Sequence, residues 1–140
     1  MIGKLDDYLR FNEAALSLRS QRQELIASNI ANADTPGYKA RDIDFASALQ
    51  GVMARTSPPA GVLNATAPAH LGGAGQNRDL LPDGTQVQYR GVVQGAVDGN
   101  TVDMDVERNQ FADNALRYEA GITMLNNQIR TMMAAIQGGQ

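Results

Sequence analysis

Apolar residues in the last third of the chain recur at alternating intervals of four and three residues. This heptad pattern is typical of a helix that packs along another helix. Asp103, Asp105 and Glu107 stand before or in its first turn, where the helix dipole favours negative charge. The pattern therefore predicts a helix over residues 105–137. Its predicted seam consists of Phe111, Ala115, Tyr118, Ile122, Leu125, Ile129, Met132 and Ile136.

A second long helix is predicted near the start of the chain. Neither Pro nor Gly occurs between Lys4 and Asp34, and the apolar positions are separated by good helix formers. A helix over residues 4–33 would be about 45 Å long at 1.5 Å per residue. Polar residues interrupt a strict seam, so we expect this helix to use more than one face. The seam positions assigned to it are Leu9, Leu16, Ile26 and Ile30.

The periodic pattern is lost between the two helices. Residues 55–77 are rich in Pro, Gly, Ala, Ser and Thr, a composition that predicts a loop. Within residues 85–97, Val87 and Tyr89 alternate with polar residues, which predicts a strand or a hairpin. The sequence Asp-Gly-Asn at residues 98–100 is a turn signal that precedes the second helix.

These elements predict a mainly α fold, in which long N- and C-terminal helices pack as an antiparallel coiled-coil hairpin with a small β-containing, loop-rich insertion. The predicted parts are the N-terminal helix and turn (residues 1–37), the insertion (residues 38–100) and the C-terminal helix (residues 101–140). A hairpin of two helices buries only one narrow stripe. A second apolar face of the first helix is then left for other chains, which points to assembly rather than catalysis.

Composition narrows the function classes. The chain has 140 residues, only 5% of them aromatic and none of them Trp, which favours thin helix-on-helix packing. A net charge of -3 argues against nucleic acid as the main partner. Charged residues interrupt the first ten positions, and no run approaches the ~20 apolar residues that span a bilayer. We expect a cytosolic chain, or one exported without a cleaved leader.

The candidate motifs for catalysis or metal binding lack the residues that each motif requires at the required spacing. The acidic stretch at residues 98–107 lacks the Gly and Glu that an EF-hand loop needs in either register, and capping of the second helix explains the same acids. His70 is the one histidine and stands in a loop-like segment without a second ligand. The run Gly72–Gly75 lacks the strand and the Lys-Ser or Lys-Thr of a phosphate loop. With no cysteine in the chain, thiolate chemistry is also excluded. No catalytic, metal or cofactor site is predicted, and we do not expect an enzyme.

The most distinctive string is NIANADTPGY, at residues 29–38. Pro36 and Gly37 form the signature of a type II turn, and the residue before a proline is disfavoured in a helix, so the first helix is expected to end before Thr35. An ordinary helix end and turn explains the string from Asn32 onward. It does not explain Asn29, because this position lies within the predicted helix, where a residue of higher helix propensity would stabilise the helix more.

Residues 28–45, SNIANADTPGYKARDIDF, resemble the N-terminal signature of bacterial flagellar rod and hook proteins. The residues that match are Asn29, Ile30, Ala31, Asn32, Thr35, Pro36, Gly37 and Tyr38. Together with the stretch at residues 99–107, the continuation ARDIDF is most similar to the proximal rod members of the basal body.

The resemblance implies a structural protein without enzyme activity. Family members pair their terminal helices into a coiled-coil domain around the axis of a hollow tube, which transmits torque and continues the export channel. They leave the cell through the flagellar type III apparatus without a cleaved leader. A proximal rod member would lie in the periplasmic rod near the inner membrane. Its implied partners are copies of itself, other rod proteins, the adaptor protein FliE, the inner-membrane MS ring and the export gate, with no nucleic acid and no small-molecule substrate.

Two hypotheses follow for the function. The first is a structural subunit of a helical assembly, with Asn29, Asn32, Thr35, Pro36, Gly37 and Tyr38 as the turn and assembly motif. In this interpretation Asn29 and Asn32 make hydrogen bonds between subunits or between segments of one chain. The alternative is a soluble helical-hairpin adaptor or a chaperone-like interaction protein.

Overall fold

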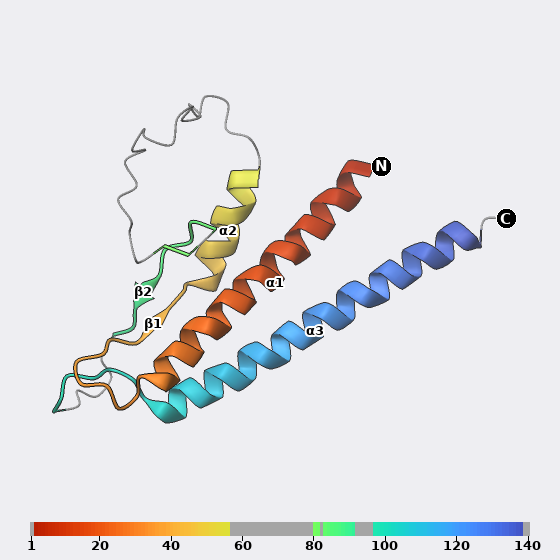
Figure 1. The fold of residues 1–140 in the computed structure, drawn as a ribbon. Coiled ribbons are helices and arrows are strands. Elements are labelled where there is room, and N and C mark those ends of the chain that lie inside the picture. Colours follow the sequence, from red (N-terminus) through yellow and green to blue (C-terminus); the bar gives the residue numbers. More distant parts are fainter. Residues whose placement is uncertain (1, 57–79, 82, 92–96, 139–140) are drawn as a thin grey trace, which may run out of the picture.

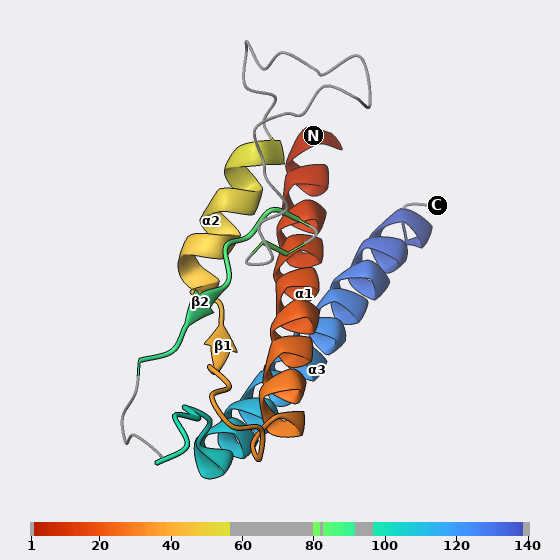
Figure 2. The ribbon, with the colours of Figure 1, turned by 60° about the vertical axis from the view of Figure 1, so that its left-hand side comes forward.

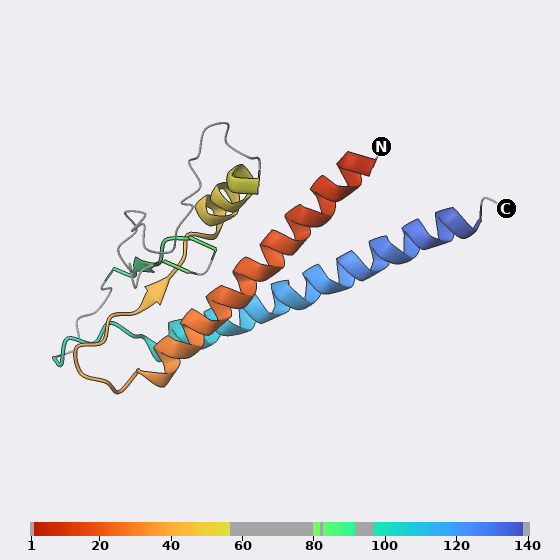
Figure 3. The ribbon, with the colours of Figure 1, turned by 45° about the horizontal axis from the view of Figure 1, so that its top comes forward.

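The computed structural model describes residues 2–56, 80–81, 83–91 and 97–138. Two long helices dominate it, α1 (Ile2–Ala31) and α3 (Met104–Gln137). They run antiparallel, lie close together near the end of α1 and the start of α3, and diverge toward the chain termini (Figures 1, 2 and 3). The predicted mainly α fold with two long terminal helices is confirmed, and the helix limits differ from the predicted ones by about two residues, within the usual variation.

The chain between the long helices adds a short helix and a two-stranded sheet. Helix α2 (Phe45–Thr56) lies along α1, and α3 packs against a different side of α1 (Figure 2). Strands β1 (Arg41–Asp42) and β2 (Gln88–Tyr89) pair antiparallel, with Arg41 opposite Tyr89. The predicted β element within residues 85–97 therefore includes β2, whereas residues 92–96 lie outside the described part of the chain.

Helix α2 is not among the predicted elements, although its sequence carries helix signals. The carboxylate of Asp44 accepts hydrogen bonds from the backbone N–H groups of Ala46 (3.1 Å) and Ser47 (3.4 Å), as an N-cap does. Apolar residues then follow at helical spacing, which gives one apolar face. These residues are Phe45, Ala48, Leu49, Val52 and Met53.

The core lies on the α2 side of α1, rather than between the two long helices. Its buried members come from α1, the position directly after β1, α2 and the segment before β2, and they are Leu18, Leu25, Ile43, Ala48 and Val87. Phe45, Leu49, Val52 and Leu81 pack around this cluster. The guanidinium of Arg19 lies 4.4 Å from the centre of the Phe45 ring and so covers part of the core.

Several features singled out in the sequence fall outside the described residues. These are His70, the Gly72–Gly75 run and the predicted loop from residue 57 to residue 77. Among the helices of the described residues, none has both the length and the apolar content needed to cross a membrane.

The position of the core predicts a contrast between two isoleucines. Ile43 is 5% exposed and Ile136 is 79% exposed. We expect Ile43→Ala to lower the free energy of unfolding by about 2–5 kcal/mol, because it removes buried methyl groups and leaves a cavity. Ile136→Ala, the matched control, should change it by less than about 0.5 kcal/mol. Denaturant unfolding of the purified chain measures both, and equal effects would contradict this placement of the core.

Candidate functional site

The string NIANADTPGY ends α1 and turns the chain toward β1. The backbone N–H of Tyr38 donates to the carbonyl of Thr35 over 3.2 Å, and Gly37 has a φ of +72°. A positive φ at the third residue is what a type II turn requires, so the predicted turn is confirmed. Asn32 acts locally: its Nδ2 donates to the carbonyl of Ser28 at the end of α1, over 2.8 Å.

The segment before α3 holds the turn from the other side. Asn100 is buried, and its Nδ2 lies within hydrogen-bond distance of three carbonyl oxygens that follow α1, those of Asn32 (3.1 Å), Ala33 (2.7 Å) and Thr35 (3.0 Å). Gly37 also donates from its backbone N–H to the carbonyl of Asp98 over 3.0 Å. The sequence showed only a turn signal at residues 98–100, so the role of Asn100 as a cap for a distant helix was missed.

Asn29 is fully buried and pairs with the backbone of β1. Its Oδ1 accepts from the N–H of Arg41 over 3.0 Å, and its Nδ2 donates to the carbonyl of Arg41 over 2.8 Å. The side-chain amide therefore occupies the edge of β1 as a neighbouring strand would. This pairing explains why an asparagine stands where the helix alone would favour another residue.

Glu107, in the first turn of α3, is also fully buried and has partners from two other elements. Its Oε2 accepts from Nδ2 of Asn29 over 3.2 Å, and its Oε1 accepts from a guanidinium nitrogen of Arg90, directly after β2, over 2.5 Å. The N-cap of α3 is Asp103, which accepts from the N–H groups of Asp105 and Val106 over 3.0 and 3.2 Å. Of the three acids predicted near the start of α3, Asp103 is the N-cap, Glu107 is a buried ion-pair partner, and Asp105 is exposed in the first turn.

Three further residues extend this cluster across the molecule. Arg22 on α1 donates to both carboxylate oxygens of Asp42 on β1, over 2.8 and 3.0 Å, and Arg90 donates to one of them over 3.0 Å. Gln110 on α3 accepts from Arg22 over 2.8 Å and from Arg90 over 3.2 Å. We call these groups the polar junction, and its members are Arg22, Asn29, Asp42, Arg90, Glu107 and Gln110.

The electrostatics of the polar junction are balanced, with two guanidinium groups facing two carboxylates. Burial alone would raise the pKa of Asp42, but hydrogen bonds from Arg22, from the Ile43 backbone N–H and from Arg90 outweigh it, so that its pKa lies below the ordinary value. The hydrogen bond to Asp42 likewise raises the pKa of Arg22. In the described part of the chain no three His, Cys, Asp or Glu side chains are grouped to hold a metal ion. The junction directs its charged groups at one another, which fixes chain segments in place.

The predicted seam of α3 is only partly covered by α1. Leu125 and Met132 are partly buried, Phe111, Tyr118, Ile122 and Ile129 are 37–40% exposed, Ala115 is exposed, and Ile136 is 79% exposed. On α1, Ile26 is fully buried, and Leu9, Leu16 and Ile30 are partly buried. At 100° per residue, the apolar stripe of α3 is turned roughly 50° away from the direction of its most buried positions. The role of these positions as a seam stays a prediction.

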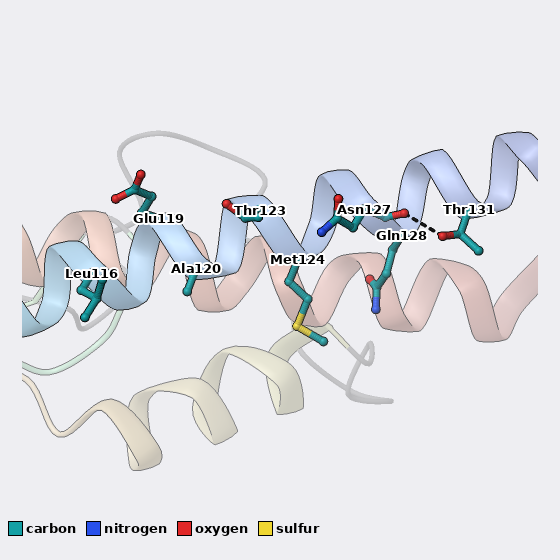
Figure 4. A pocket seen from close by; sticks show the side chains of 8 residues that line it. All are labelled: Leu116, Glu119, Ala120, Thr123, Met124, Asn127, Gln128 and Thr131. Carbon is teal, nitrogen blue, oxygen red and sulfur yellow. Dashed lines mark hydrogen bonds between the residues drawn. The ribbon is translucent and has the colours of Figure 1, made fainter.

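A shallow groove lies on the other flank of α3. Figure 4 shows the eight side chains that line it along successive turns of this one helix. They are Leu116, Glu119, Ala120, Thr123, Met124, Asn127, Gln128 and Thr131. The hydroxyl of Thr131 donates to the backbone carbonyl of Asn127 over 2.9 Å, within the helix itself. Both flanks of α3 thus remain accessible in the single chain.

Comparison with known proteins gives one consistent result. The sequence profile of flagella basal body rod proteins matches residues 9–39, which include most of α1 and the turn. The chain is 51% identical to the flagellar basal body rod protein FlgB of Escherichia coli K12, and 50% identical to that of Salmonella typhimurium, over 99% of each chain. It is 38% identical to the FlgB protein of Buchnera aphidicola, over 99% of this chain and all of the relative.

The ion pairs of the polar junction predict unequal effects of two Arg→Met substitutions. Arg90→Met leaves the buried Glu107 carboxylate without its cation, and we expect the free energy of unfolding to fall by about 3–5 kcal/mol. Arg117→Met breaks the exposed pair with Asp113 and should cost less than about 0.5 kcal/mol. The double variant Arg90→Met/Glu107→Gln should recover a large part of the loss. Strictly additive single effects in this cycle, measured by denaturant unfolding, would contradict the pairing.

The low pKa of Asp42 predicts a dependence of stability on acid. A carboxyl whose pKa is lower in the folded than in the unfolded chain stabilises the fold above its unfolded pKa, and this contribution is lost as the pH falls through the folded value. The free energy of unfolding should therefore decrease below about pH 4. Asp42→Asn should flatten this decrease, and Ile136→Ala, which removes no titratable group, should not. Denaturant unfolding measured between about pH 3 and pH 6 tests both, and a slope unchanged by Asp42→Asn would contradict the assignment.

Proposed function

The chain belongs to the FlgB family of flagellar basal body rod proteins, and on this premise we propose that it is a structural subunit of the proximal rod. In this proposal further copies and other rod proteins assemble with it into a hollow helical tube at the flagellar basal body. The tube transmits torque and continues the export channel. Catalysis has no part in the proposal.

The observation that carries the assembly proposal is the exposed apolar stripe of α3. Ile122, Ile129 and Ile136 stand seven residues apart on one flank, and their exposure rises from 37% to 79% toward the end of the helix. Met133 lies beside them and is also exposed. Because α1 and α3 diverge toward the termini, α1 covers this end of the stripe least (Figure 1). A continuous apolar flank of this kind is typical of a surface that another chain covers.

The geometry of one chain also favours an open assembly. The exposed isoleucines and the groove lie on different flanks of the same helix. A contact between two different surfaces repeats from subunit to subunit and gives a filament unless the rotation closes it into a ring. A rod that grows by addition of subunits requires a contact of this type.

In this proposal the turn motif serves to position segments of the chain. Asn29 is fully buried and bonded to β1 and Glu107, which favours bonding between segments of one chain over bonding between subunits. Asn32 bonds within the end of α1. Thr35, Pro36 and Gly37 are exposed and are the part of the motif that a neighbouring subunit can reach.

The partners at the base of the rod follow from the likeness of residues 28–45 and 99–107 to proximal rod members. They are the adaptor protein FliE, the inner-membrane MS ring and the export gate. The subunit would reach this place in the periplasm through the flagellar type III apparatus, without a cleaved leader.

The proposal predicts that a charge on the apolar stripe blocks assembly. We expect Ile122→Asp, and likewise Leu125→Asp, to abolish rod formation and motility, because a carboxylate would be buried between helices without a partner. Asn109→Asp, an exposed position on the side of α3 opposite the stripe, is the control and should leave swimming intact. Swimming in soft agar and electron microscopy of isolated basal bodies measure the outcome. Normal motility of the Ile122→Asp strain would refute the role of the stripe.

A further inference from the structure

Two parallel lines of residues run along α3, and each repeats every seven positions. The first line faces α1 and consists of Glu107, Asn114 and Gly121. The second line is shifted by one residue, and it consists of Ala115, Ile122, Ile129 and Ile136. The first line, which faces α1, therefore contains only two polar residues and a glycine. The second line, which is accessible, contains only apolar residues.

Asn114 is the central member of the first line. It is 1% exposed, and its Nδ2 donates to the backbone carbonyl of Arg19 over 2.8 Å and to Oε1 of Gln23 over 2.6 Å. Its Oδ1 is buried and accepts no hydrogen bond from the described residues. An amide oxygen buried in this way costs free energy, so stability alone would favour an apolar residue at this position.

Gly121, one heptad further on, fits a side chain of α1. A Cβ atom at this position would lie 3.0 Å from Cδ2 of Leu16, which is closer than ordinary van der Waals contact. Gly121 therefore forms a notch that receives Leu16. The cost of about 1 kcal/mol in helix propensity that glycine carries is consistent with this use.

The three contacts hold together in only one alignment of the helices. Apolar heptad stripes tolerate a shift of one heptad, about 10 Å, because similar side chains meet again. A shift that moves Asn114 to the place of Gly121 would set its amide against Leu16 and leave Gln23 without this donor. The opposite shift would remove the notch from Leu16. A buried asparagine is known to select register in coiled coils at a cost in stability.

We propose that Asn114 is needed, beside Glu107 and the notch at Gly121, to set the register in which α3 pairs with α1 of its own chain. The apolar line beside it is thereby kept in a fixed position along the molecule. This inference concerns contacts within one chain, so it stands apart from the proposed rod function.

Cysteine cross-linking tests the register directly, because the chain contains no cysteine of its own. Ser20 and Ala115 line one cavity between α1 and α3, so Ser20→Cys/Ala115→Cys reports the native register. Glu13→Cys/Ala115→Cys and Ala27→Cys/Ala115→Cys report shifts of one heptad in either direction. Intrachain disulfides formed with copper phenanthroline are read by gel mobility, in cells that produce the full chain and in the purified chain.

We expect the native pair alone to cross-link in the parent chain. With Asn114→Leu, cross-linking of the shifted pairs should rise at least about tenfold, while the free energy of unfolding stays equal or increases. Asn114→Ala adds no apolar bulk and should also release the shifted pairs. Asn126→Leu, an exposed asparagine of α3, is the matched control and should behave like the parent.

Two results would overturn the proposal. One is a background level of the shifted pairs in both Asn114 variants, with the native pair retained, since another contact would then set the register. The other is the loss of every cross-link in both variants, the native pair included. Asn114 would then be needed for the helices to pair at all, rather than for their alignment.

Discussion

The carboxylate of Glu107 is removed from water at the point where four segments of the chain meet. A buried charge of this kind is tolerated only with a cation and hydrogen-bond donors in place. The cation comes from Arg90 beside β2, and the amide donor comes from Asn29 on α1. Arg90 and Arg22 share Asp42, and Asn29 holds the edge of β1. The helical hairpin and the small sheet consequently depend on each other, because either one alone would leave charged or polar groups buried without partners.

This dependence separates two kinds of contact along α3. Near its start, α3 is fixed to α1 by polar groups with directional bonds. Farther along, it keeps an apolar flank that the single chain does not cover. Directional bonds specify geometry, whereas apolar area supplies much of the free energy of association. A structural subunit benefits from this division, since its own fold is determined before its surface meets another copy.

The periodicity of the sequence was sufficient to predict both long helices, their antiparallel pairing and the turn at Pro36 and Gly37. Helix α2 was missed because its short apolar face follows the turn directly and resembles a continuation of the loop. The polar junction was missed for a different reason. Arg22, Asp42, Arg90 and Glu107 look like ordinary surface charges in the sequence, and only the tertiary fold shows which of them are buried. The heptad rule likewise identified an apolar stripe, but it could not show that Asn114 and Gly121 lie closer to α1 than several of the isoleucines.

The distance along the chain between the partners of the polar junction has a consequence for biosynthesis. Asn29 and Glu107 are 78 residues apart, and Arg22 and Gln110 are 88 residues apart. Closing so long a loop carries an entropic cost before any contact compensates for it, and contacts of this range slow folding. While the ribosome is still adding the first hundred residues, Glu107 has not been synthesised and cannot bond to Asn29. The polar junction can therefore form only after residue 110 has been synthesised, and until then Asn29 and Arg22 of α1 lack their partners on α3.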